Sequence, residues 1–269
     1  MKLGIFAKTF AGPDPATVLN AAAAAGYDGV AYNMACSGLT PMPDLVSDAD
    51  VAAITAAVRA SGQTLFSLSG TYNMIHPDPS VRAAGHARLA ILASRAHDLG
   101  TSLITLCTGS RDAEDQWRHH PDNASAAAWA DLCASFAVAV RIAEDHDICL
   151  GVEPELANVV NSAAAARRLI DQMGSPRIKI VLDPANLFET GDPKTVIDAA
   201  VDLLAPDLAM AHAKDRDQRG GFVAAGRGVV DFGHFIARLN AAGFAGAMVT
   251  HGLSAAEAPK VARYLRARL

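Results

Sequence analysis

Short apolar runs recur along the chain, and each is followed by a longer, alanine-rich stretch whose apolar positions suit one face of a helix. Runs that are apolar almost throughout are typical of strands covered on both faces, as in a parallel sheet. The eight predicted strands are Leu3–Ala7, Gly29–Asn33, Thr64–Ser69, Ser102–Cys107, Ile148–Glu153, Ile178–Asp183, Leu208–His212 and Ala247–His251. Eight strand-then-helix units in a chain of this length predict an α/β fold, a (β/α)8 TIM barrel of parallel strands.

Helix-capping residues support this alternation. Asp14, Asp78 and Asp192 each stand directly before a proline, which places a capping carboxylate ahead of the first helical position. Ser254 and Glu257 have the spacing of a capping box before the last helix, although Pro259 predicts that this helix begins later. A doubly wound open sheet is the alternative fold, but the first strand–helix turn lacks the glycine-rich phosphate loop of that class. Since no linker-like segment divides the chain, residues 1–269 are expected to form one domain.

Composition narrows the class of partner. The 269 residues carry 23 Lys+Arg against 28 Asp+Glu, a formal net charge of −5, and the pI is about 6.0. Such a chain has no global attraction to phosphate backbones or anionic membranes, so neither nucleic acid nor membrane is an expected partner. The four cysteines form no C-x-x-C pair and do not suggest a secreted disulfide framework. A soluble cytoplasmic protein is the expectation.

The predicted strand ends carry the candidate chemistry, because barrel enzymes place their active sites at the C-terminal ends of the strands. Four neighbouring strands end in Glu153, Asp183, His212 and His251. Taken singly, each is more often a helix cap, a surface charge or a hydrogen-bonded core residue. Together, converging carboxylates would repel one another unless a cation compensated them. The set therefore predicts a site for one divalent metal ion: Mn²⁺, Mg²⁺, Zn²⁺ or Co²⁺.

Four motifs resemble those of the xylose-isomerase-like TIM barrels. They are Gly151-Val152-Glu153-Pro154-Glu155, Val181-Leu182-Asp183-Pro184-Ala185-Asn186, Ala211-His212-Ala213-Lys214-Asp215 and Gly226-Arg227-Gly228-Val229-Val230-Asp231-Phe232. That superfamily includes sugar-phosphate isomerases and epimerases, ketose 3-epimerases, inosose dehydratases and abasic-site nucleases of the endonuclease IV type. The nuclease branch is disfavoured, because the extra histidines of its three-zinc cluster are missing at the matching positions.

The resemblance implies roles for the four strand-end residues. In the ketose-epimerase branch a Glu, an Asp, a His and a second Glu hold one divalent metal, and the two glutamates exchange a proton with the substrate. Glu153, Asp183 and His212 match the first three positions, whereas His251 stands where the second Glu belongs. The implied activity is a metal-dependent isomerase or epimerase of a small sugar or sugar phosphate. Its chemistry is proton abstraction next to a carbonyl through a metal-bound enediolate, with Glu153 as the preferred base and His251 as the candidate catalytic partner.

Two other functions stay open. A metal-dependent dehydratase of an inosose-like polyol or a keto-acid would tolerate the altered second base. A catalytically silent sugar-binding barrel would result if the missing glutamate abolished turnover. Self-association into a homo-oligomer is also an open expectation.

Eight further side chains are candidate substrate contacts, each with a structural alternative: Glu155, Asn186, Lys214, Arg227, Tyr72, His76, Arg111 and Trp117. Glu155 and Lys214 lie two residues beyond Glu153 and His212, so strand alternation points them to the same mouth. The structural alternative for Lys214 is an ion pair with Glu155 or Asp215. The charged stretch of residues 214–227 is expected to be a loop, and its alternating charges are more often solvated than used to bind a phosphate or carboxylate. Asn186 stands where epimerases often carry a substrate-contacting His. The unusually long loop of residues 108–123 carries Arg111 and Trp117 and is a candidate binding loop or a packed surface loop.

Overall fold

Eight parallel strands form a closed ring in the computed structural model, which describes residues 1–187 and 192–269. Within these residues the ring runs β1-β2-β3-β4-β5-β6-β7-β9, and the pairings of β6 with β7 and of β9 with β1 close it. Its strands are β1 (Lys2–Phe6), β2 (Gly29–Tyr32), β3 (Thr64–Ser69), β4 (Leu103–Leu106), β5 (Cys149–Val152), β6 (Ile178–Leu182), β7 (Leu208–Arg216) and β9 (Ala247–Thr250). The predicted parallel TIM barrel is confirmed.

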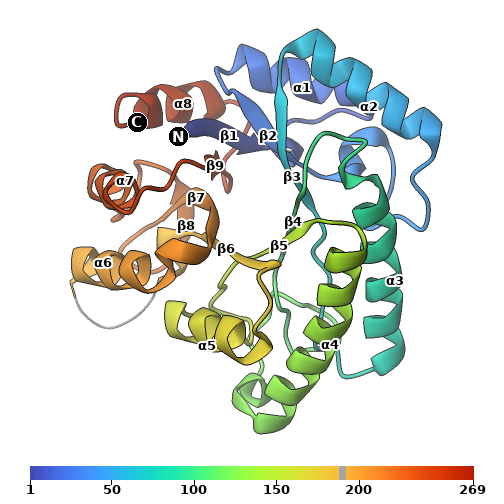
Figure 1. Ribbon diagram of the computed structural model, residues 1–269. Coiled ribbons are helices and arrows are strands. Elements are labelled where there is room, and N and C mark those ends of the chain that lie inside the picture. Colours follow the sequence, from blue (N-terminus) through green and yellow to red (C-terminus); the bar gives the residue numbers. More distant parts are fainter. Residues whose placement is uncertain (188–191) are drawn as a thin grey trace.

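Helices surround the strands as an outer ring (Figure 1). They are α1 (Pro15–Ala24), α2 (Asp48–Ser61), α3 (Pro79–Ala96), α4 (Ala126–Asp145), α5 (Ala163–Met173), α6 (Pro193–Leu204), α7 (Phe232–Ala241) and α8 (Ala258–Arg266). The carboxylates of Asp14, Asp78 and Asp192 each accept a backbone N–H of the helix that follows, as their sequence positions predict. Helix α8 begins at Ala258, beyond the start that the Ser254 motif alone would suggest.

Among the described residues, two separate hydrophobic clusters stabilise the barrel. A large cluster fills the space between strands and helices, while a small second cluster joins Ala31, Val181, Met210, Ala247 and Val249, with Phe66 packed against it. Glycine is needed beside Phe66: a Cβ on Gly4 would lie 2.8 Å from the phenyl ring. Close packing of this kind leaves the strand ends as the place where side chains can meet a ligand.

Strand β7 is longer than the sequence pattern predicted. It continues past His212 to Arg216 and pairs in antiparallel fashion with β8 (Phe222–Ala224), where the sequence suggested a solvated, charged loop. The difference lies in Asp215, which is fully buried and accepts backbone N–H bonds from Gly226 and Gly228, among others. A carboxylate that accepts several N–H donors is stable inside a protein, so this charged residue extends the strand and anchors the loop after β8.

Helix α4 is long and apolar enough, by length and composition, to cross a membrane. In the barrel it instead contacts α3, α5 and β5. Its apolar side chains Leu132 and Phe136 are fully buried. The apolar composition of α4 is therefore accounted for by its packing in the barrel.

Asp207, at the start of β7, contributes to stability in a pH-dependent way. Its carboxylate accepts bonds from Arg167 of α5 (2.8 Å) and from Lys179 of β6 (3.0 Å). Partial burial alone would raise the pKa of Asp207, but these two cations outweigh burial and hold the pKa below its usual value. The resulting stability is present above the unfolded-state pKa of about 3.9 and is lost as the pH falls through the lower folded-state pKa.

Asp207→Asn is accordingly expected to lower the free energy of unfolding at neutral pH by about 1 kcal/mol. Urea unfolding of both proteins at a series of pH values checks this, because the difference between them should shrink toward zero in acid. A difference that stays constant with pH would contradict an electrostatic role for Asp207.

Candidate active site

Four predicted ligand side chains meet at one end of the barrel. Glu153 directly follows β5, Asp183 follows β6, His212 lies within β7, and His251 follows β9. One ligand atom from each residue lies within 4.8 Å of the ligand atoms of the other three. His251 Nε2 donates to Asp183 Oδ2 at 2.9 Å, and His212 Nδ1 lies 3.1 Å from Glu153 Oε1. The fold thus brings together residues that are up to 98 positions apart in the sequence, as the difference between 251 and 153 shows.

This cluster fits a divalent ion. Ligands that bind one ion at about 2.0–2.2 Å lie at most about 4.4 Å from one another, so the observed spread requires an adjustment of only a few tenths of an ångström. The buried Nδ1 of His212 has no hydrogen bond of acceptable geometry, which leaves it available as a ligand. Asp183 is oriented by the backbone N–H of Ala185, which donates to its Oδ1. Mixed imidazole and carboxylate donors suit several divalent metals.

The electrostatics of the cluster keep its members in distinct protonation states. Burial alone would raise the pKa of Glu153, but His212 and His251 outweigh burial and lower this pKa to about 2. Burial lowers the pKa of His251, and the neighbouring His212 adds to the effect. At neutral pH Glu153 is therefore an ionised carboxylate and His251 a neutral imidazole, which are the forms that bind metal ions.

Two uncharged groups hold the Glu153 carboxylate. Asn186 Nδ2 donates to Glu153 Oε1 at 3.1 Å and to the Pro154 carbonyl oxygen at 2.9 Å. The Cys107 thiol, at the end of β4, lies 4.0 Å from Glu153 Oε2, and burial raises the pKa of this thiol so that it keeps its proton. Asn186 is a predicted substrate contact, whereas nothing in the sequence marks Cys107. In the structure both orient Glu153.

A cavity of about 600 Å³ opens beside the cluster. Glu155, Lys214 and Trp117, three of the predicted substrate contacts, line it together with Glu153, His212 and His251. Lys214 Nζ lies 3.7 Å from Glu155 Oε2 and 3.8 Å from Asp183 Oδ2. The structural alternative for Lys214, an ion pair with Glu155, is therefore present, and Lys214 still faces the cavity.

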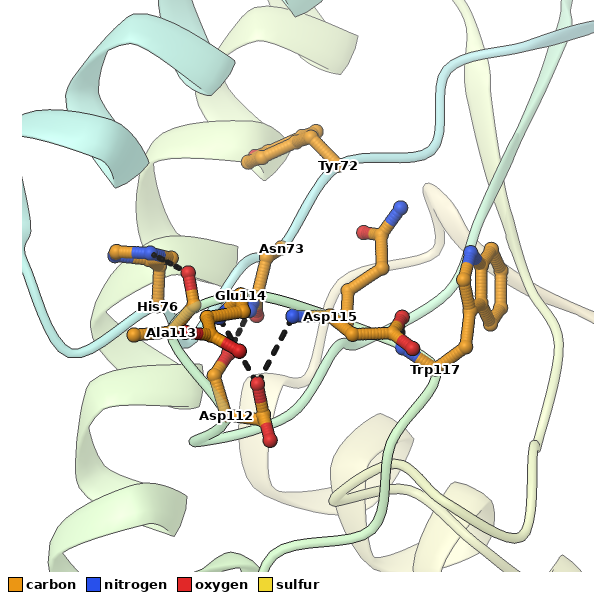
Figure 2. A pocket seen from close by; sticks show the side chains of 9 residues that line it. Tyr72, Asn73, His76, Asp112, Ala113, Glu114, Asp115 and Trp117 are labelled. Carbon is orange, nitrogen blue, oxygen red and sulfur yellow. Dashed lines mark hydrogen bonds between the residues drawn. The ribbon is translucent and has the colours of Figure 1, made fainter.

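Four other predicted contacts lie away from this cavity. Tyr72 and His76 line a neighbouring pocket of about 320 Å³, which Gln116 and Trp117 also line, and Figure 2 shows His76 across from Trp117. Arg111 donates to Asp131 at 2.7 Å and to the Ile75 carbonyl oxygen, so its guanidinium joins the long loop to α4. Arg227 pairs with Glu257 at 3.1 Å, outside the cavity. Arg111 and Arg227 are thus paired with carboxylates, and contact of any of these four side chains with a substrate stays a prediction.

Gln116 and Phe222 line the cavity but were not identified from the sequence. Gln116 is an uncharged amide in the middle of a long loop, and Phe222 lies in the segment expected to be a solvated loop. No spacing or charge marked either residue. Their position emerges only once the loop after β4 and the β7–β8 hairpin are placed around the barrel mouth.

Comparison with known proteins agrees with this architecture. The chain matches the family model of the xylose isomerase-like TIM barrel over residues 19–268. No curated protein matches its sequence. Among solved structures, a 3-keto-D-glucoside 4-epimerase from E. coli is similar, with 18% identity, 99% of each chain covered and a TM-score of 0.81. A D-psicose 3-epimerase from Clostridium cellulolyticum H10, solved with D-tagatose, is also similar. It is 18% identical, the match covers 100% of this chain and 99% of the other, and the TM-score is 0.79. At such identities the structural likeness shows the fold, and the family match over nearly the whole length establishes that the chain belongs to the xylose isomerase-like TIM barrel family.

Proposed function

We propose that this protein is a divalent-metal-dependent isomerase or epimerase acting on a small carbohydrate. The observation that carries the proposal is the convergence of Glu153, Asp183, His212 and His251, from four neighbouring strands, beside a cavity that Glu153, His212 and His251 line. The similar solved structures support it, because those described above are epimerases of keto sugars.

The proposed chemistry is removal of a proton from a carbon next to a carbonyl. A divalent ion held by the four cluster residues would act as a Lewis acid and stabilise the negative charge that develops on the substrate oxygens. Glu153 faces the cavity as an ionised carboxylate and accepts the proton, while Asn186 and Cys107 fix its orientation. Burial of this wall of the cavity restricts the access of water to the reacting carbon.

The fate of that proton decides the reaction. Its return to the same carbon from the opposite face gives an epimer, and its return to the neighbouring carbon gives an isomer. A second glutamate is missing at the end of β9, where His251 stands with its Nε2 bonded to Asp183. His251 is the proposed partner for the second proton transfer.

Dehydration is the second candidate, and Lys214 favours it. Burial alone would lower the pKa of Lys214, but Asp183, Glu153 and Glu155 outweigh it and raise the pKa, so the ammonium keeps its proton. Lys214 lines the cavity and is therefore placed to protonate a departing hydroxyl group. The first step, proton removal by Glu153, is common to both reactions.

Deuterium exchange distinguishes these functions. The protein is loaded with Mn²⁺ and incubated in deuterated water with a panel of keto sugars and inososes, and products are followed by NMR. We expect deuterium at one carbon together with an epimer or isomer, and His251→Glu should preserve or increase this activity. Loss of water from the substrate would favour the dehydratase. Thermal stabilisation by a sugar without exchange for any substrate or metal would leave only a sugar-binding barrel.

A further inference from the structure

The cavity changes in character between its inner wall and its mouth. At the inner wall, the side chains of Glu153 and His212 are 12% and 11% exposed, whereas Trp117 and Phe222, which also line the cavity, are 50% and 46% exposed. Trp117 stands on the loop after β4, and Phe222 stands on β8, which pairs with β7. The two aromatic side chains are therefore brought to the cavity by segments that follow different strands of the barrel.

The cavity is larger than one sugar ring requires. Its volume of about 600 Å³ is the volume that about 20 water molecules occupy in liquid water. A hexose is smaller, because it has only about 12 non-hydrogen atoms. A substrate that places its reacting carbons at the buried wall therefore leaves the outer part of the cavity to a further group. Large aromatic side chains exposed at the mouth of the cavity favour a group with an apolar face.

Hydrogen bonds fix the backbone that carries Trp117. The backbone N–H of Trp117 donates to Asp115 Oδ1 at 2.9 Å, and Asn158 Nδ2 donates to the Gln116 carbonyl oxygen at 3.2 Å. Lys214 Nζ lies 3.7 Å from the centre of the Phe222 ring, so this ring has a side-chain contact of its own. Segments that are ordered before a ligand arrives lose less conformational entropy on binding.

Gln116 adds a polar requirement to the same region. Its side-chain Oε1 is buried and has no hydrogen-bond partner, and Gln116 lines the cavity beside Trp117. A buried acceptor without a donor is costly, so a ligand hydroxyl that donates to it would be favoured. A group with both an apolar face and hydroxyl donors is a second sugar ring.

We propose that Trp117, Phe222 and Gln116 form an outer subsite for a second sugar ring, so that the preferred substrate is a glycoside in which a keto-sugar unit carries another sugar. The inference rests on the proposed function for the reacting unit. In this arrangement the second ring stacks its C–H face on Trp117 and donates a hydroxyl to Gln116, with Phe222 closing the other side.

Three matched ligands test the subsite: a keto-hexose, its methyl glycoside, and the glycoside in which glucose replaces the methyl group. The methyl glycoside is the control because any glycosidic bond keeps the reacting sugar ring closed. With Mn²⁺-loaded protein we expect kcat/KM for deuterium exchange to be about 10-fold or more higher for the glucosyl than for the methyl glycoside. Trp117→Ala should bring this ratio close to one, whereas Leu156→Ala, which removes an exposed apolar side chain that does not line the cavity, should leave the ratio unchanged. Equal kcat/KM for the two glycosides in the unmodified protein would overturn the subsite.

A binding measurement separates failure of the subsite from failure of the proposed function. The chain has two tryptophans, so Trp129→Phe leaves Trp117 as the sole indole reporter. Titration of that variant, monitored by Trp117 fluorescence, should give a dissociation constant about 10-fold lower for the glucosyl than for the methyl glycoside. Equal dissociation constants would refute the subsite. A preserved preference in binding without any deuterium exchange would support the subsite and refute the catalytic role of the metal cluster.

Discussion

Replacing Glu153 by glutamine is expected to lower the rate of deuterium exchange into the substrate by about 10³-fold, the usual range for loss of a general base. Glutamine has nearly the same shape and retains an oxygen that accepts from Asn186 Nδ2, so the fold around the site should be preserved. Its amide cannot take a proton from carbon. The measurement is single-substrate exchange followed by NMR, with the far-ultraviolet circular dichroism of the variant compared with that of the unmodified protein.

Glu257→Gln is the matched control for this experiment. Glu257 lies before α8, bonds Ser254 and pairs with Arg227, so it lies outside the cavity. Its replacement should leave exchange within about twofold of the unmodified rate, since surface substitutions rarely act at a distance. If Glu153→Gln retained most of the exchange activity, Glu153 would not be the base.

Replacing Asp183 by asparagine is expected to weaken binding of Mn²⁺ by about 100-fold or more. Mutation of residues that only orient a metal ligand already lowers metal affinity by about 10–100-fold, and Asp183 is itself a proposed ligand. The variant should fold: asparagine Oδ1 still accepts from the Ala185 N–H, and its amide can donate to His251. In the unmodified protein, metal at 100 times its dissociation constant should add about 2.7 kcal/mol to the free energy of unfolding. At the same metal concentration that stabilisation should fall to about 0.4 kcal/mol or less for Asp183→Asn.

Asp78→Asn provides the control for the loss of one negative charge. Asp78 caps α3 at an exposed position, and asparagine is an equally good cap. Isothermal titration with Mn²⁺ should therefore give the unmodified affinity for Asp78→Asn. Full affinity in Asp183→Asn as well would remove Asp183 from the ligand set.

The barrel was predictable because its strands are short, apolar and separated by well-marked helix starts. Each aspartate–proline pair caps a helix, and each of the eight apolar runs contains a strand. The β7–β8 hairpin was not predictable, because burial of Asp215 depends on N–H donors from Gly226 and Gly228, which become its neighbours only after folding. Local sequence therefore favoured a solvated loop where the chain forms a paired strand.

The ligand cluster was predictable for a geometric reason. In a parallel barrel every strand ends at the same rim, so residues at equivalent strand ends, such as Glu153 and Asp183, approach one another without any need to know the loops. Arg111 and Arg227 show the limit of that argument. Their partners Asp131 and Glu257 lie 20 and 30 residues away, as the residue numbers show, and the loop paths that join them leave no periodic signal.

The position of Gln116 shows a second limit. Its relevance derives from an unpartnered, buried amide oxygen, and such a property exists only in three dimensions. Cys107 is similar, since its thiol matters through its 4.0 Å distance from Glu153. Residues that act by orienting another group are the least visible in a sequence, because their chemistry is ordinary and only their placement is special.

The most direct test of the account is to locate the metal. Crystals of the protein grown with Mn²⁺ should show, in an anomalous difference map, one ion per chain in contact with Glu153, Asp183, His212 and His251. The account predicts that this peak disappears for Asp183→Asn. A protein that binds no ion at these four side chains, or binds it elsewhere with the cluster held together by its own hydrogen bonds, would contradict the central claim.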